Sequence, residues 1–120
     1  MTQKAILVVE DDPLIRQSLR ALEGEYEVLT AKDGVQGLRR FDRYQDRISL
    51  IITDLRMPRL GGEILVEWVR RVNPSLPVIV MTGWTESVDL DELRGKSKVA
   101  LLWKPFEFAH LMKLMASFAV

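Results

Sequence analysis

Five short apolar runs alternate along the chain with stretches of helical spacing, and this alternation constrains the fold more than any other feature. The runs are rich in β-branched residues and cover residues 5–9, 28–30, 50–53, 77–82 and 99–103. Between and after them, apolar residues recur three or four positions apart, as on one face of an amphipathic helix. Strands that alternate with helices in this way pair in parallel through right-handed crossovers. The sequence therefore predicts an α/β fold with five parallel strands and five helices.

The predicted helices differ in how clearly their apolar faces are marked. The weakest lies over residues 86–94, where Val88, Leu90 and Leu93 stand among acids and Gly95 suits the helix end. The other faces consist of Leu14, Ile15, Leu19 and Leu22; Val35, Leu38 and Phe41; Ile64, Leu65, Trp68, Val69 and Val72; and Phe108, Leu111, Met112, Met115 and Phe118. For Trp68 we expect core or half-exposed packing, with a contact between two copies as the alternative.

Composition limits the class of protein. The 120 residues suffice for one domain with a core, and we expect residues 1–120 to form a single domain, since no linker or repeat marks a boundary. The 17 basic and 17 acidic residues balance, so no overall field attracts nucleic acid or an anionic membrane. The chain has no cysteine, which excludes thiolate metal sites and favours an intracellular setting. The early apolar stretch 5–9 is too short for a signal or membrane segment, so we expect a cytoplasmic protein.

Polar residues gather where four of the five predicted strands end. In open parallel sheets, ligand sites form beyond the carboxyl ends of the strands, so we expect these side chains to converge. They are Glu10, Asp11 and Asp12 after the first strand, Asp54 after the third, Thr82 at the end of the fourth and Lys104 after the fifth.

These residue types suit a divalent cation and a phosphoryl group. Carboxylates within about 4–6 Å of one another repel, and a hard divalent ion with oxygen ligands relieves that repulsion. A site with few carboxylates that keeps bound waters suits Mg²⁺. Lys104 adds a positive charge and Thr82 adds a hydroxyl donor. The set describes a site for a phosphoryl group carried on an acid, with Asp54 as the nucleophile.

Each of these residues also has an ordinary structural interpretation. Acids before Pro13 suit a helix N-terminus, where proline is common in the first turn. Thr82 alone is typical of a strand end, and Lys104 alone is typical of a solvated charge. Their joint occurrence at the strand ends of one sheet favours a functional site.

Short motifs in this order make the chain resemble the receiver domain of two-component response regulators over essentially its whole length. The motifs are ILVVEDD at residues 6–12, DG at 33–34, DLRMP at 54–58, VMTG at 80–83 and WKPF at 103–106. The resemblance implies a flavodoxin-like, doubly wound five-stranded parallel sheet of order 2-1-3-4-5. In the runs MTGW at residues 81–84 and ALLWKPF at 100–106, the chain is most similar to receivers of hybrid sensor histidine kinases.

The resemblance also implies a role for each acid. Asp54 would accept a phosphoryl group from a sensor histidine kinase or a histidine phosphotransfer protein. Mg²⁺ would be bound directly by Asp11, Asp54 and the backbone carbonyl of Arg56, and by Glu10 mainly through a metal-bound water. Beyond Mg²⁺-dependent self-phosphorylation and slow self-dephosphorylation, no enzyme activity is expected.

Two further residues would respond to the phosphoryl group. Lys104 would bridge to it, and the bond from Lys104 to Pro105 is expected to be cis, since only X-Pro bonds adopt that form at low energy. Thr82 would move toward the new oxygens and draw the following loop with it. The surface from Glu86 to Val120 would then bind a downstream effector or a second copy of the chain.

Two loops carry expectations of their own. Gly61 and Gly62 stand where relatives commonly have Asp before the final Gly, and we expect them to leave that loop freer. Arg56 and Trp84 lie two residues past Asp54 and Thr82, and we expect them to shield an acyl phosphate from water.

Other functions compete with the receiver. A phosphohydrolase of the haloacid dehalogenase type also uses an aspartyl nucleophile, a lysine and Mg²⁺, but it needs a second acid where Arg56 stands. A flavin-binding module is compatible with the fold, but it needs amides and hydroxyls where the acidic first loop lies. A degenerate receiver would act only as an interaction module. Leu101, which replaces the Tyr or Phe usual in the family, keeps that last alternative open.

Overall fold

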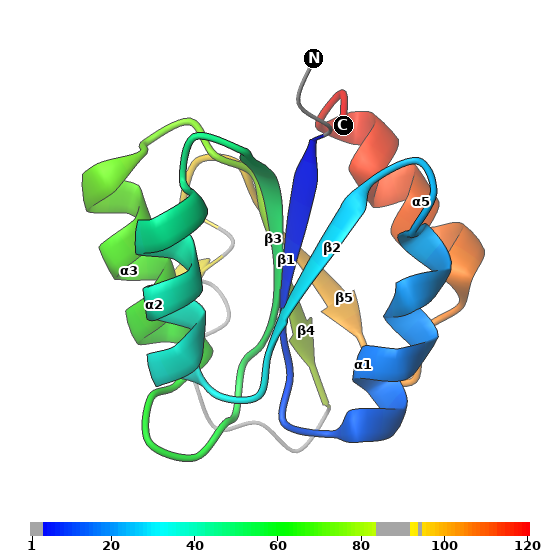
Figure 1. Cartoon of the computed structure of the whole chain (residues 1–120), viewed down its shortest axis with the longest axis horizontal. Coiled ribbons are helices and arrows are strands. Elements are labelled where there is room, and N and C mark those ends of the chain that lie inside the picture. Colours follow the sequence, from blue (N-terminus) through cyan, green and yellow to red (C-terminus); the bar gives the residue numbers. More distant parts are fainter. Residues whose placement is uncertain (1–3, 84–91, 94) are drawn as a thin grey trace.

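The centre of the molecule is a five-stranded parallel sheet (Figure 1). The computed structural model describes residues 4–83, 92–93 and 95–120. The strands are β1 (Ala5–Val9), β2 (Glu27–Ala31), β3 (Ile48–Asp54), β4 (Val78–Thr82) and β5 (Val99–Trp103). They pair in the order β2-β1-β3-β4-β5, which confirms the predicted topology. The strand β3 is longer than predicted at both ends, so Asp54 is its last residue.

Helices cover both faces of the sheet (Figure 1). α2 (Gly34–Tyr44) and α3 (Gly62–Val72) lie on one face. α1 (Pro13–Leu19), continued by the 3-10 helix η1 (Arg20–Leu22), lies with α5 (Phe108–Ser117) on the other. The helix predicted over residues 86–94 lies outside the described residues, apart from Glu92 and Leu93. No helix in the part of the chain that is described could cross a lipid bilayer.

The two layers of the core follow from the alternation of side chains along β1. All five β1 residues are fully buried, because helices cover the strand on both faces. Ala5, Leu7 and Val9 belong to the hydrophobic cluster shared with α2 and α3, while Ile6 and Val8 belong to the cluster shared with α1 and α5. Because β1 runs parallel to β2 and β3, the residues after Val9 emerge at the same edge of the sheet as those after Ala31 and Thr53.

The residues of the apolar face predicted for α3 fall into two groups that differ in burial, and Trp68 is half-exposed, which is one of its two expected environments. Leu65 and Val69 are fully buried, whereas Ile64, Trp68 and Val72 are 49%, 44% and 44% exposed. At 3.6 residues per turn, the second group lies about 100° around the helix from the first. The five residues therefore form an inner face against the sheet and an outer stripe toward solvent.

Candidate functional site

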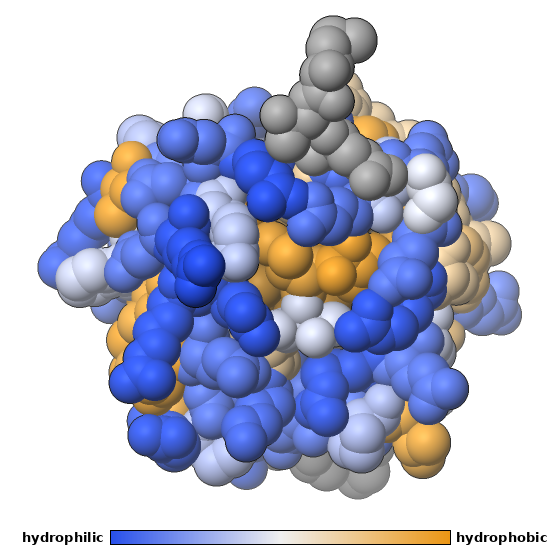
Figure 2. Space-filling model, viewed as in Figure 1, coloured by the Kyte–Doolittle hydropathy of each residue, from blue (hydrophilic) through white to orange (hydrophobic). Residues whose placement is uncertain are grey.

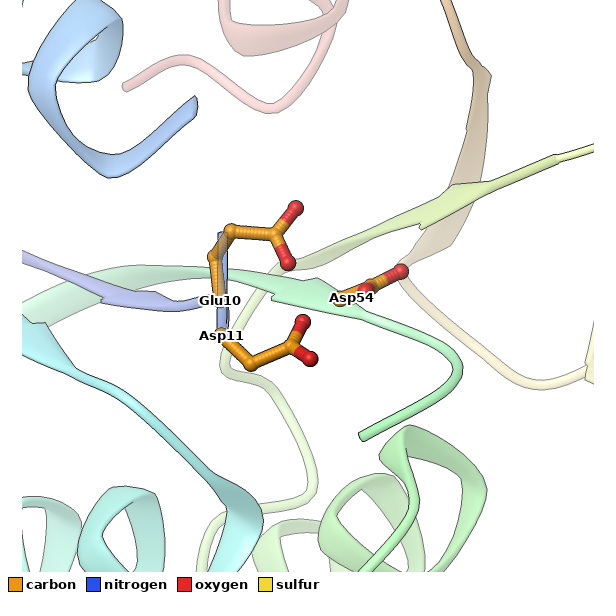
Figure 3. Close-up of side chains that lie close together, drawn as sticks. All are labelled: Glu10, Asp11 and Asp54. Atoms are coloured by element: carbon orange, nitrogen blue, oxygen red, sulfur yellow. The ribbon is translucent and has the colours of Figure 1, made fainter. Parts of the chain in front are cut away.

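Three carboxylates meet at the carboxyl ends of β1 and β3, at the bottom of the view in Figure 1. Glu10 and Asp11 follow β1 directly, and Asp54 ends β3. These strands are neighbours in the sheet, with Val9 paired to Thr53, so their ends coincide. One oxygen from each acid lies within 4.8 Å of the others, and the carboxylates face a common space (Figure 3).

Lys104 reaches two of these acids from the end of β5. Its Nζ lies 2.8 Å from Oε1 of Glu10 and 3.1 Å from Oδ1 of Asp54. The backbone nitrogen of Lys104 donates to the carbonyl oxygen of Thr82 at 2.7 Å, which holds the lysine against the end of β4. The bond from Lys104 to Pro105 is cis, as predicted. Four residues from three strand ends are thus brought together.

Burial sets the electrostatics of this group. Glu10 is fully buried and Asp54 is 5% exposed, whereas Asp11 is exposed. Burial raises the pKa of the Glu10 carboxyl from its ordinary value of 4.5 to about 7; the hydrogen bond from Lys104 opposes the rise and the neighbouring Asp54 adds to it. Without a further cation, Glu10 is therefore poised to hold a proton near neutral pH.

The pKa of Lys104 is raised as well, but for a different reason. Burial lowers the pKa of Lys104, but the hydrogen bond to Glu10 and the charge of Asp54 outweigh burial, so its pKa is raised. One arrangement raises both pKa values, because Lys104 faces two acids while the buried Glu10 shares that ammonium with Asp54. Lys104 consequently stays charged in the site.

Two hydrogen bonds hold the loop that carries Glu10, Asp11 and Asp12. They give these three acids different roles, which the sequence did not distinguish. Arg16 donates from Nη1 to the backbone oxygen of Glu10 at 2.7 Å. Asp12 accepts from the backbone nitrogen of Leu14 at 2.9 Å and caps α1. The capping interpretation therefore applies to Asp12, while Glu10 and Asp11 face the site. Arg16 had no signal in the sequence beyond its charge on the first helix.

Thr82 ends the strand next to the one that carries Asp54, and its backbone carbonyl accepts the hydrogen bond from Lys104. It is fully buried at the end of β4, one residue beyond Met81, the register partner of Asp54. Its hydroxyl donates to the carbonyl oxygen of Gly83 at 3.2 Å. Arg56 is exposed in the loop after β3. Trp84, predicted to overhang the site, lies outside the described residues.

The start of α3 packs directly beneath Asp54. Oδ1 of Asp54 accepts from the backbone nitrogen of Leu55 at 2.8 Å, and the backbone nitrogen of Gly62 donates to the Leu55 carbonyl at 2.8 Å. A Cβ atom on Gly62 would overlap the carbonyl oxygen of Asp54 and lie 3.0 Å from Cα of Leu55. The expectation of a freer loop is therefore wrong for Gly62, which serves a close approach of two backbones.

The donor set fits a hard divalent cation. Every candidate ligand atom in the group of Glu10, Asp11 and Asp54 is a carboxylate oxygen, the type preferred by Mg²⁺. When all three acids are ionised, the ammonium of Lys104 leaves a formal charge of minus two. A divalent ion would balance that charge.

Comparisons with known proteins agree with this geometry. A family model described as the response regulator receiver domain matches residues 6–116. A response regulator receiver domain protein of Clostridium thermocellum superimposes with a TM-score of 0.82 and 30% identity, over 96% of this chain and 93% of that one. The chemotaxis protein CheY4 of Vibrio cholerae gives a TM-score of 0.84 at 28% identity, over 98% and 99% of the two chains. These likenesses favour the receiver over the hydrolase and the flavin module.

Curated relatives include both regulators and kinases. The transcriptional regulatory protein GlrR of Escherichia coli is 33% identical over 104 residues, which are 85% of this chain and 23% of that protein. The sensor kinase CckA of Brucella abortus is 29% identical over 108 residues, which are 88% of this chain and 11% of that protein. The chain thus spans less than a quarter of either relative. It belongs to the response regulator receiver domain family, which works with histidine kinases in two-component signalling and is not a conventional enzyme class.

Proposed function

We propose that the chain accepts a phosphoryl group on Asp54 in a Mg²⁺-dependent reaction and thereby changes the surface that it offers to partners. One observation carries the proposal: Asp54 lies within 4.8 Å of the carboxylate oxygens of Glu10 and Asp11 and 3.1 Å from the ammonium of Lys104. A nucleophilic acid, a site for a cation and a fixed positive charge are the parts that phosphoryl transfer needs.

Asp54 would attack the phosphorus atom of a phosphohistidine on a sensor histidine kinase or a phosphotransfer protein. The new oxygen–phosphorus bond forms as the nitrogen–phosphorus bond breaks, and the imidazole leaves. Two contacts of the Asp54 side chain within the described residues, from Leu55 and Lys104, use Oδ1, so we assign the attack to Oδ2. These contacts orient the carboxylate before the donor arrives, which lowers the entropic part of the barrier.

Positive charge around Asp54 would come from two sources. Receiver domains generally bind Mg²⁺ through acidic residues, and here Glu10, Asp11 and Asp54 would hold it, with the backbone carbonyl of Arg56 as a further ligand. When bound, the ion neutralises the charge that develops on the phosphoryl oxygens. The ammonium of Lys104 would exchange its contact with Asp54 for one with those oxygens.

We expect the hydroxyl of Thr82 to change its hydrogen-bond partner when Asp54 is phosphorylated. A phosphoryl group adds roughly −1.5 to −2 charges. The hydroxyl of Thr82 now donates to the neutral carbonyl of Gly83, and a charge-assisted bond is stronger by about 1 kcal/mol. Turning toward the phosphoryl group would release Gly83 and the segment that follows it. The surface from Glu86 to Val120 would then bind a downstream effector or a second copy, in the cytoplasm.

Incubation with acetyl phosphate and Mg²⁺, read by intact mass, tests the proposal. We expect one added phosphoryl group that is lost with chelator and in Asp54→Asn. The matched control is Asp12→Asn, because Asp12 neighbours the site in sequence but caps α1, and asparagine caps a helix equally well. Asp12→Asn should be labelled like the original chain. Absence of labelling at any Mg²⁺ concentration would favour the degenerate receiver instead.

A further inference from the structure

Three of the six large apolar side chains that are exposed in the described residues lie on one helix. Ile64, Trp68 and Val72 of α3 are 49%, 44% and 44% exposed. They recur every fourth residue and form one stripe along the outer side of the helix. Figure 2 shows apolar atoms along the side of the molecule on which α3 lies. A contiguous exposed apolar stripe of this kind marks an interaction surface.

The charged residues beside the stripe are acidic in the first half of α3 and basic in its last turn. Glu63 and Glu67 lie in its first half and Arg71 in its last turn, and Glu67 and Arg71 are exposed. Within the described part of the chain, neither Glu67 nor Arg71 forms an ion pair or a side-chain hydrogen bond. Arg70 differs, because it donates to the backbone oxygens of Ser97 and Lys98 and ties α3 to the start of β5. Glu67 and Arg71 are therefore available to a partner.

We propose that α3 is the interface of a symmetric dimer, in which a second copy packs its own α3 antiparallel against the stripe. A two-fold axis at Trp68 places this ring against the partner's Trp68 and Ile64 against the partner's Val72. The same axis brings Glu67 close to the partner's Arg71, twice per dimer. Rows of residues spaced by four interlock at a crossing angle of about −50°.

The charge order selects this arrangement over a parallel one. In a parallel two-fold pair, the flank that carries Glu67 and Arg71 would face the partner's opposite flank, which carries the buried residues Leu65 and Val69, so no charge pair would form. The antiparallel pair is instead self-complementary, as a two-fold interface requires. From Ile64 to Val72 the stripe extends only about 12 Å. It is smaller than a standard interface, so the dimer is weak, with a dissociation constant above about 10 µM.

Sedimentation equilibrium of the whole chain, from low micromolar to near-millimolar concentration, tests the dimer. We expect the average mass to rise toward that of two copies, and Trp68→Lys to weaken the association at least tenfold. The matched control is Leu14→Lys, since Leu14 is 75% exposed but lies on α1, outside both α3 and the surface from Glu86 to Val120. Leu14→Lys should associate like the original chain. Circular dichroism melting of both variants shows that each is folded.

Charge reversal tests the antiparallel geometry separately. Arg71→Glu places acid against acid and should weaken the dimer severalfold, whereas combining it with Glu67→Arg restores the pairing with the two signs exchanged. A mass that stays monomeric at every concentration overturns the proposal. So does a dimer that survives Trp68→Lys but is lost in Leu14→Lys. Failure of the double exchange to recover the affinity contradicts the antiparallel arrangement. None of these outcomes depends on phosphorylation of Asp54.

Discussion

Glu10 is a fully buried carboxyl that shares the ammonium of Lys104 with Asp54. Burial raises its pKa from 4.5 to about 7, above the value that it has in an unfolded chain. Between these two pH values the folded chain binds more protons at Glu10 than the unfolded chain does. The contribution of Glu10 to stability is therefore complete below pH 4.5 and is lost as the pH rises through about 7.

This titration predicts how Glu10→Gln changes the pH dependence of stability. In the absence of divalent ions, the original chain should lose stability relative to the variant from pH 4.5 to pH 7, by up to about 3 kcal/mol. Urea unfolding of both proteins in chelator, at several pH values, measures the difference. If the stability of the two proteins had the same pH dependence, burial would not raise the pKa of Glu10.

Residue types and their order predicted which side chains converge, but not how they share contacts. Glu10, Asp11, Asp54 and Lys104 follow buried parallel strands, and topology alone brings such positions to one edge. Asp12 caps α1 and Asp11 faces the site. Which of the two carboxylates turns to the helix end could not be predicted from the sequence. The role of Arg16 likewise depends on a long side chain returning to the Glu10 carbonyl.

At the scale of elements, the junction of β3 and α3 couples the proposed acceptor to the helix that follows it. The first residue of α3, Gly62, is buried against the backbone of Asp54 and Leu55. Its neighbour Gly61 is the N-cap, and the three atoms nearest to a Cβ atom there all belong to the end of the flexible Glu63 side chain, the closest at 2.7 Å. The two glycines therefore differ in what they tolerate.

Gly62→Ala is expected to destabilise the fold much more than Gly61→Ala. The added methyl group at residue 62 must displace one of two backbones, which we expect to cost about 2–4 kcal/mol. At residue 61 the Glu63 side chain can move aside, and the cost should stay below about 1 kcal/mol. Chemical unfolding of both variants gives the comparison. Equal losses would mean that the close approach beneath Asp54 is not a steric requirement.

The helices and strands were largely predictable, whereas the burial of individual residues on α3 was not. Alternating apolar runs predicted the strands, because a buried parallel strand must be apolar on both faces, and the resemblance to receiver domains predicted their order. On α3 the spacing placed Ile64, Trp68 and Val72 on one apolar face with Leu65 and Val69, but these three are 44–49% exposed, as the half-exposed packing expected for Trp68 allowed. Periodicity identifies apolar residues on a helix, but it does not say whether the sheet or a second copy covers them.

For the whole molecule, binding of Mg²⁺ should appear as added stability. An ion that binds only the folded state stabilises it by about 2.7 kcal/mol at a hundred times its dissociation constant. We expect the melting temperature to rise with Mg²⁺ in the original chain and in Asp12→Asn, and to rise much less in Asp11→Asn. Asp11 is exposed, so its replacement should leave the ion-free melting temperature nearly unchanged. An equal rise in all three proteins would place the ion elsewhere.

The measurement that tests the central claim most directly is the position of the phosphoryl group. Borohydride reduces an aspartyl phosphate to homoserine, and peptide mass spectrometry then identifies the residue. After treatment with acetyl phosphate and Mg²⁺, we predict homoserine at residue 54 alone, and unmodified Asp54 when Mg²⁺ is withheld. Homoserine at residue 11 or 12 with Asp54 unmodified would contradict the account.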